Sequence, residues 1–321
     1  MSRAWITFAV VPLVALVACA GPSSAPSSSP AVARDLDPGG AASQQLAFDF
    51  GSLWVAVGDK GTVARIDPIT GKVAAELKVS DPSRVPPRAH VVHVAPSAVV
   101  SAFGAIWAVG ADGVLARIDP ATNAVATFDV AVVGGYMAAS DTALWISSYD
   151  DGALVAFDPV SRTVASTVTG VGGVFGVAVG FGSVWAVSKS GHEVVRLDPK
   201  TGTVIVRIPA PRSPDYVAIG AGSVWVTRET PAAVLRIDPA SNAVSATMSA
   251  DASWGTGTGI AFYDGAIWAG CLVRIDPGTE KVAAAFSCGA GRSQGGLAFG
   301  AASAWVWDFG RVHQVPLALV R

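Results

Sequence analysis

A short pattern returns about every 40 residues along most of this 321-residue chain, and it constrains the fold more than any other feature. A complete copy has a Trp inside an apolar run, a second run that ends in Asp-Pro, a tight turn and a third run, as in 182–206. Seven Trp residues mark the copies, at spacings of 53, 38, 40, 40, 43 and 37 residues: Trp54, Trp107, Trp145, Trp185, Trp225, Trp268 and Trp305. Several short β-branched runs per copy at this period are typical of propeller blades and exclude a helical solenoid.

The sequence therefore predicts an all-β fold, a seven-bladed β-propeller with four antiparallel strands per blade. We name the strands of a blade A to D, from the channel outward, and in the fourth copy expect them near 176–179, 184–188, 193–197 and 203–208. The seventh copy offers only three strands, at 297–299, 304–309 and 312–317. An open edge would leave backbone groups unpaired, so we expect 31–36 to supply the outer strand and close the ring by pairing of the N- and C-terminal strands.

The Asp-Pro pair opens the C–D turn in six copies, at Asp67, Asp119, Asp158, Asp198, Asp238 and Asp276. Pro fixes φ at the second turn position, the Asp carboxylate can accept from N–H groups of the turn, and a Gly or Asn follows where positive φ is needed. We interpret these Asp residues as scaffold rather than metal ligands, and the repeated Trp as filling between blades rather than a binding cage. An Arg precedes the Asp by two residues in five copies, at Arg65, Arg117, Arg196, Arg236 and Arg274, and we expect it to contact that Asp or to be solvated.

The N-terminal stretch is typical of an export signal. Arg3 precedes an apolar run over 4–18, which is too short to span a membrane as a helix. The tetrapeptide 16–19, Leu-Val-Ala-Cys, resembles the lipobox of bacterial lipoproteins, and this resemblance implies cleavage before Cys19 and a diacyl anchor on its sulfur. The alternative is an ordinary secretory signal with a Cys there by chance. Small, Ser- and Pro-rich residues over 21–33 form a flexible tether.

The predicted organisation is a signal peptide at 1–18, the lipidated Cys and tether at 19–35 and the propeller at 36–321, on the extracytoplasmic face of the bacterial cell envelope. Half of the residues are hydrophobic, the formal net charge is −2, and Lys and Arg are not clustered, so no nucleic acid is expected as a partner. The expected partners of this monomer are the lipid membrane, through Cys19, and an unknown ligand or envelope protein.

Binding residues are expected on the face formed by the D–A and B–C connections, because these loops differ between copies while the C–D turns on the other face repeat. The candidate ligand-binding residues are Tyr136, Tyr149, Asp150, Phe175, His192, Tyr216, Arg228, Glu229, Trp254 and Arg292. Strand A should begin nine residues before each Trp, at Gln45, Ala98, Tyr136, Gly176, Tyr216, Gly259 and Gly296. Two Tyr with Phe175 could form a lopsided apolar pocket there, or simply plug the channel entrance.

Two copies depart from the pattern. An insertion of roughly a dozen residues lies between Lys78 and Ser101, and it holds His90 and His93. The sixth copy is shortened instead, and antiparallel pairing places Cys271 roughly opposite Cys288. Outside the cytoplasm two facing Cys favour a disulfide over a metal pair, so we predict a Cys271–Cys288 bond.

The recurrent G-[SA]-[VIL]-W followed by R-[IL]-D-P-x-[TS]-[GN]-x-V resembles the YVTN-type (YncE-like) β-propeller repeat and the closely similar blades of the streptogramin (virginiamycin B) lyase group, over about 44–315. The lyase resemblance implies Mg²⁺ with a His and a Glu near the channel, and Trp-Phe-Thr-Glu in strand B. The matching tetrapeptides here are WVAV, WAVG, WISS, WAVS, WVTR, WAGC and WVWD, so no catalytic residue is carried over.

The sequence also lacks a G-x-S-x-G elbow, a P-loop and an H-E-x-x-H motif. We therefore predict a non-catalytic binding protein with no cofactor. The alternative is a metal-dependent lyase or lactonase-like hydrolase that uses Mg²⁺ or Ca²⁺.

Overall fold

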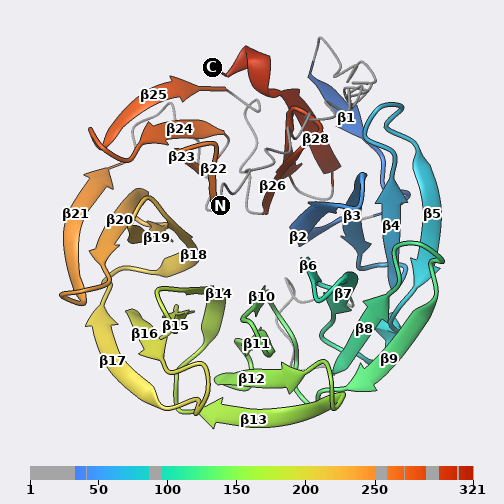
Figure 1. Ribbon diagram of the computed structural model, residues 1–321, viewed down its shortest axis with the longest axis horizontal. Helices are drawn as coiled ribbons and strands as arrows, with labels where there is room; N and C mark the ends of the chain where they lie inside the picture. The colour runs from blue at the N-terminus through green and yellow to red at the C-terminus, as the bar shows by residue number, and fades with distance from the viewer. Residues whose placement is uncertain are drawn as a thin grey trace, which may run out of the picture.

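The computed structural model describes residues 33–40, 42–86, 96–249, 259–270, 272–286, 296–308 and 311–320. Within these ranges, seven four-stranded antiparallel sheets are arranged around a central axis, which confirms the predicted seven-bladed propeller (Figure 1). The A strands lie innermost and the D strands form the outer wall. No helix in the described residues is long and apolar enough to cross a membrane.

The blades follow one another along the chain. Blade 1 is β2 (Ala42–Asp49), β3 (Ser52–Val57), β4 (Thr62–Ile66) and β5 (Val73–Lys78). Blade 2 is β6 (Ala98–Ala102), β7 (Ala105–Val109), β8 (Val114–Ile118) and β9 (Val125–Asp129). Blade 3 is β10 (Met137–Ala139), β11 (Leu144–Ser148), β12 (Ala153–Asp158) and β13 (Thr163–Thr169). Blade 4 is β14 (Val174–Gly180), β15 (Ser183–Ser188), β16 (Glu193–Leu197) and β17 (Val204–Pro209).

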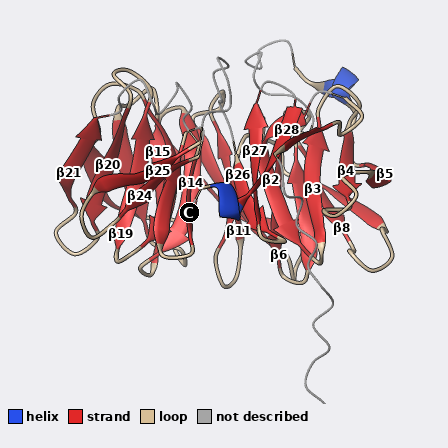
Figure 2. Ribbon diagram, turned by 90° about the horizontal axis from the view of Figure 1, so that it is seen from above, coloured by secondary structure: helices blue, strands red, loops and turns tan. Residues whose placement is uncertain are grey.

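Blade 5 is β18 (Pro214–Gly220), β19 (Ser223–Arg228), β20 (Ala233–Asp238) and β21 (Ala243–Ser249). Blade 6 is β22 (Ile260–Tyr263), β23 (Ala266–Ala269), β24 (Val273–Asp276) and β25 (Lys281–Ala285). Blade 7 is β26 (Leu297–Gly300), β27 (Ser303–Asp308), β28 (Arg311–Pro316) and, as its outer strand, β1 (Arg34–Leu36). The described residues also form two short 3₁₀ helices, η1 (Pro82–Arg84), which stands above one end of the ring in Figure 2, and η3 (Leu317–Leu319).

The repeated Trp residues are scaffold, as predicted. Each lies mid-strand in strand B and is at most 2% exposed, packed in the wedge between neighbouring blades. In six blades the indole N–H donates to the carbonyl oxygen five residues earlier, as Trp185 does to Gly180 at 3.0 Å. Trp145 is the exception, because its buried Nε1 has no hydrogen-bond partner in the described structure.

The C–D turns have the predicted chemistry. In each of the six Asp-Pro copies one carboxylate oxygen accepts from the N–H groups two and three residues later, as Asp198 does from Lys200 and Thr201 at 2.7 and 3.0 Å. These N–H bonds hold the pKa of each of the six carboxyls below its usual value. The turn ends at a residue with positive φ, which is Gly or Asn in four copies, Arg162 in blade 3 and Glu280 in blade 6.

The repeated Arg has a different partner from the one expected. Arg196 lies over the Trp185 ring, at 4.8 Å from its centroid, and donates to the C–D turn of the next blade, to Pro239 O and Asn242 Oδ1, both at 2.7 Å. The equivalent Arg of blades 1 and 5 also reaches the following blade. These guanidinium groups therefore bind neighbouring blades together at one face of the ring, rather than pairing with the Asp of their own turn.

The predicted closure of the ring is confirmed. β1 pairs antiparallel with β28, with Arg34 opposite Gln314 and Leu36 opposite Val312. Gln314 faces Trp305 in β27, which is where five of the other six blades carry the repeated Arg. Strand β1 begins two residues before the predicted domain boundary at 36. The N-terminal strand thus completes the seventh blade and leaves its sheet without a missing strand.

Candidate functional site

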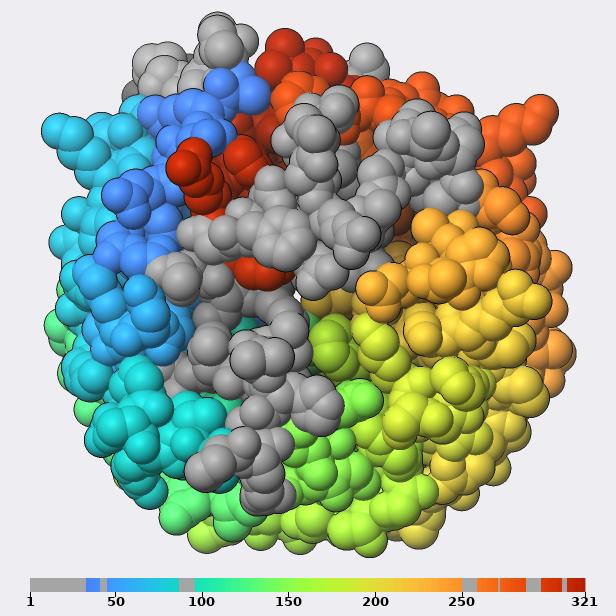
Figure 3. Space-filling model, turned by 180° about the vertical axis from the view of Figure 1, so that it is seen from behind, coloured from blue at the N-terminus to red at the C-terminus, as the bar shows by residue number. Residues whose placement is uncertain are grey.

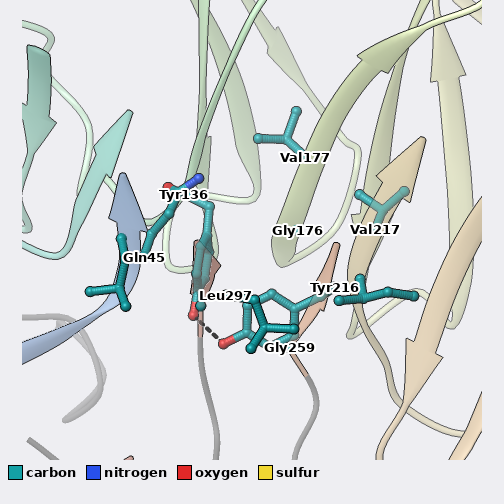
Figure 4. A pocket seen from close by; sticks show the side chains of 11 residues that line it. Gln45, Tyr136, Gly176, Val177, Tyr216, Val217, Gly259 and Leu297 are labelled. Carbon is teal, nitrogen blue, oxygen red and sulfur yellow. Dashed lines mark hydrogen bonds between the residues drawn. The ribbon is translucent and has the colours of Figure 1, made fainter. Parts of the chain in front are cut away.

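The channel opens at the D–A/B–C face among the innermost strands. A cavity of about 110 Å³ lies there (Figure 4). Six of the seven positions predicted to begin strand A line it, namely Gln45, Tyr136, Gly176, Tyr216, Gly259 and Gly296. This volume has room for only a few water molecules and is well below the several hundred Å³ of a typical small-molecule site.

Two tyrosines from non-adjacent blades meet at this cavity. The hydroxyl oxygens of Tyr136 in blade 3 and Tyr216 in blade 5 are 2.6 Å apart, as the dashed line in Figure 4 marks. Blade 4 has Gly176 at the intervening position, where an added Cβ would lie 2.8 Å from Asp215 O, so the absence of a side chain lets the inner strands of blades 4 and 5 approach closely. Burial, and then the neighbouring Tyr216, raises the pKa of Tyr136 well above its ordinary value, so its hydroxyl remains protonated.

Phe175 completes an aromatic cluster with these tyrosines. Its ring centroid is 4.9 Å from that of Tyr136 and 5.5 Å from that of Tyr216, in tilted and edge-on arrangements that aromatic pairs favour. All three side chains are buried. A second bridge crosses the channel from blade 1, where the Gln45 amide exchanges two hydrogen bonds with the backbone of Met137, at 2.9 and 3.1 Å. Of the two interpretations left open by the sequence, the described side chains support the plug.

A charged group borders this cluster on blades 4 and 5. Lys189 Nζ lies 2.9 Å from Asp215 Oδ1 and 3.1 Å from Glu229 Oε2, and 4.8 Å above the centre of the Phe175 ring. Burial by itself would lower the pKa of Lys189, but the two carboxylates outweigh it and the pKa is raised. Asp215 is almost fully buried, whereas the Glu229 side chain is 39% exposed.

Asp215 and Lys189 were not among the candidates from the sequence. Counting from Trp225 gave Tyr216 as the start of strand A, and Asp215 is one residue earlier. The signal in the sequence that could have identified Asp215 is its position next to a predicted strand A start, since the predicted strand A starts are all uncharged.

The other candidates from the sequence lie around the rim. Tyr149 packs edge-on against Phe175, with ring centroids 6.3 Å apart, and Asp150 is half-buried beside it. His192 is exposed, and its Nδ1 accepts from Ser213 N at 3.4 Å. Arg228 Nε donates to Pro231 O at 2.9 Å. Trp254 and Arg292 lie outside the described residues, as do Cys19, Cys271, Cys288 and the insertion histidines His90 and His93.

The described residues do not fit a metal centre. They contain no group of three or more His, Cys, Asp or Glu side chains arranged to hold a metal ion. In the acidic pair, Asp151 joins its B–C loop to the preceding D–A connection, because its Oδ2 accepts from Ser148 Oγ at 2.8 Å and from Val133 N at 2.7 Å. The two carboxylates that do converge, Asp215 and Glu229, bind the ammonium group of Lys189.

Comparison with known proteins places the fold. A streptogramin B lyase structure superposes with a TM-score of 0.73 at 13% identity, over 88% of this chain and 96% of that one. BamB from Moraxella catarrhalis superposes with a TM-score of 0.58 at 14% identity, over 86% and 85%. A scan of protein families and a search of curated proteins find no match. At these identities the likeness shows a shared β-propeller fold, and function has to be argued from the site.

Proposed function

We propose that this chain is a lipid-anchored β-propeller of the bacterial cell envelope that binds a ligand or a protein partner on its D–A/B–C face, without catalysing a reaction. The observation that carries this proposal is the convergence of non-repeating side chains from three consecutive blades. Tyr149 comes from blade 3, Phe175 and Lys189 from blade 4, and Glu229 from blade 5. Three of the seven blades thus present a mixed aromatic and charged patch.

This patch has the make-up of a recognition surface. Aromatic rings and Arg are enriched where proteins bind partners, and a rigid support reduces the entropy lost on binding. The support here is buried: Ser147 Oγ accepts from Tyr136 N at 2.9 Å and donates to Phe175 O at 2.8 Å, which ties blades 3 and 4 together beneath the rim. The partly exposed groups above it are Tyr149, Lys189 and Glu229.

The chemistry of the same groups favours binding over catalysis. A general base or an amine nucleophile works best with a pKa near neutral pH, and the raised pKa of Lys189 keeps its ammonium protonated. The Tyr136 hydroxyl is also held protonated and is already bonded to Tyr216.

Site-specific photo-crosslinking in the producing cells tests the binding surface. A benzophenone amino acid at Tyr149 should give a discrete adduct, which weakens when Lys189→Met and Glu229→Gln are introduced. The matched control is the same probe at Thr167, an exposed residue on the outer strand of the same blade, and it should give none. Equal adducts at both positions, or none at Tyr149, would contradict the proposal.

The anchor is tested separately through Cys19. The full-length chain should incorporate a labelled fatty acid and sediment with membranes, and the Cys19→Ser variant should do neither. A Cys19→Ser chain that still sediments with membranes would show that the lipid is not the anchor.

The competing enzymatic proposal makes a different prediction. A metal-dependent lyase or lactonase-like hydrolase would carry stoichiometric Mg²⁺ or Ca²⁺, and would lose it on Asp150→Asn or Glu229→Gln. Metal analysis of the purified protein with these two variants would separate an enzyme from a binding protein.

A further inference from the structure

The described residues expose large apolar side chains at one face of the ring and its rim. In the described part of the chain, the exposed large hydrophobic residues lie in A–B turns, in C–D turns, in strand residues close to those turns, or in η3. The most exposed is Val160, at 88%, in the C–D turn of blade 3. Ile69 holds the same place in blade 1, at 58%. These positions all belong to the A–B/C–D face and its rim, opposite the candidate binding patch.

Three phenylalanines are the clearest feature of this face. Phe50, Phe103 and Phe181 each occupy the first position of a two-residue A–B turn, with φ of 51°, 50° and 52°, and a Gly of positive φ follows each of them. Turns with positive φ at both positions favour Asn, Asp or Gly at the first, and a bulky residue there is strained. About two-fifths of each Phe side chain is nevertheless exposed.

The fold itself does not require Phe at these turns. Blades 5, 6 and 7 make the same turn with Ala221, Asp264 and Ala301, at φ of 48°, 50° and 48°. Three bulky apolar residues in a strained conformation, exposed on one face, are typical of a surface that meets an apolar partner.

The path of the chain identifies that partner. Residue 33 precedes β1 at the A–B/C–D end, because Arg34 Nη2 donates to Pro68 O and Ile69 O in the C–D turn of blade 1, at 3.1 and 2.8 Å. Only 14 residues, 19–32, separate this point from the sulfur predicted to carry the lipid. A flexible tether of that length, as the sequence predicts for these residues, would span about 20 Å on average, roughly the length of one six-residue strand. The lipid is therefore held close to this face.

We infer that the A–B/C–D face lies against the membrane surface, with Phe50, Phe103 and Phe181 inserted at the lipid–water interface. This inference rests on the lipid anchor of the proposed function. Aromatic side chains enter the interface to a shallow depth, and the tether raises their effective concentration there, so that weak contacts suffice. The candidate binding patch, on the opposite face, then points away from the membrane and is open to partners.

Lipid quenching of single fluorescent reporters on the full lipidated chain tests this orientation. The vesicles contain phosphatidylcholine, phosphatidylglycerol and a nitroxide-labelled lipid. One reporter is attached at Ala221→Cys, in an A–B turn that has no Phe, and the matched reporter at Lys60→Cys, in the exposed B–C loop of blade 1 on the other face. Labelling of the chain without either substitution is subtracted. The Ala221 reporter should be quenched and the Lys60 reporter should not.

The combined variant F50A/F103A/F181A should remove most of the quenching at Ala221 while the chain still sediments with the vesicles. It should fold, since two blades already carry Ala at this position, and an unchanged melting temperature checks this. Quenching that is equal at both reporters, or unaffected by the variant, overturns the inference although the anchor holds. A dimer that forms without lipid and is lost in the variant also overturns it, in favour of a second copy. A chain that does not sediment shows that the anchor is absent, and the inference fails with it.

Discussion

Closure of the ring depends on a strand of three residues, and Leu36 is the residue that tests it best. Its side chain is 4% exposed and packs in a core cluster with residues of blade 1 and with Trp305 and Trp307 of blade 7. Its Cδ2 also lies close enough to Gly71 that a Cβ there would be 2.7 Å away. Leu36→Ala leaves a cavity between the first and last blades, and a buried Leu→Ala change costs about 2–5 kcal/mol.

The corresponding shift in melting temperature follows from the size of the ring. At about 2.1 cal/mol/K per residue, the 289 residues from 33 to 321 give an unfolding entropy of about 600 cal/mol/K. A loss of about 3 kcal/mol therefore lowers Tm by about 5 °C. Leu319→Ala is the matched control, since this terminal Leu is 49% exposed and its truncation should cost less than about 0.5 kcal/mol.

Thermal melts of the mature chain, followed by circular dichroism, measure both variants. Hydrogen exchange adds a local readout, because loss of β1 packing should speed exchange in β28 more than in β15 of blade 4. Equal Tm shifts for the two variants, or unchanged exchange in β28, would refute the reasoning that β1 locks the ring.

Three further predictions concern the scaffold and the patch. In chemical denaturation, Trp185→Phe should lower the free energy of unfolding by about 1 kcal/mol more than Trp145→Phe, because of these two residues only Trp185 loses an indole hydrogen bond. Equal losses for the two variants would contradict this. Lys189→Met should lower the free energy of unfolding by about 1–3 kcal/mol, because it leaves the Asp215 carboxylate buried without its cation. The double variant with Asp215→Asn should recover part of this loss, and no recovery would show that the two residues are not coupled. Folding lowers the pKa of the six C–D carboxyls below the ordinary value of 3.8. Their contribution to folding stability is therefore complete above the unfolded pKa and is lost as the pH falls through the lowered pKa values. In melts between pH 6 and pH 3, Tm should decrease below about pH 4, and this decrease should be less steep for Asp198→Asn than for the unmodified chain.

The scaffold could be predicted from the sequence where its chemistry is local. The Asp198 turn is an example, because its carboxylate bonds N–H groups two and three residues away and the following Gly202 takes positive φ. The role of Arg196 could not be predicted in the same way. Its partner Asn242 is 46 residues away, and the contact depends on how one blade is set against the next. The alternation of side chains along a strand predicts which face of the sheet a residue lies on, but not which residues of the next blade it contacts.

The candidate site was predicted in position but not in detail. Counting from the Trp residues located Tyr136 and Tyr216 at the channel, because the period fixes where strand A begins. Their hydroxyl contact spans a whole blade, with Gly176 at the intervening position. A bridge of this kind depends on how the inner strands of three blades are set against one another, which a linear pattern does not show.

The seventh blade links the fold to the orientation proposed for the molecule. Where the repeated Arg would stand, it has Gln314, which by itself reaches only Pro68 O in the neighbouring turn, at 3.0 Å. Arg34 supplies the missing guanidinium from β1, donating to Gln314 Oε1 at 2.7 Å and onward to the same turn. The contact by which an Arg joins blades 1, 4 and 5 to the blade that follows is thus supplied at the ring closure by the N-terminal strand. Because that contact lies at the A–B/C–D face, the N-terminal end of β1 lies on the side that carries the exposed phenylalanines. A single departure from the repeat therefore determines both how the ring is locked and which face a lipid anchor would hold toward the membrane.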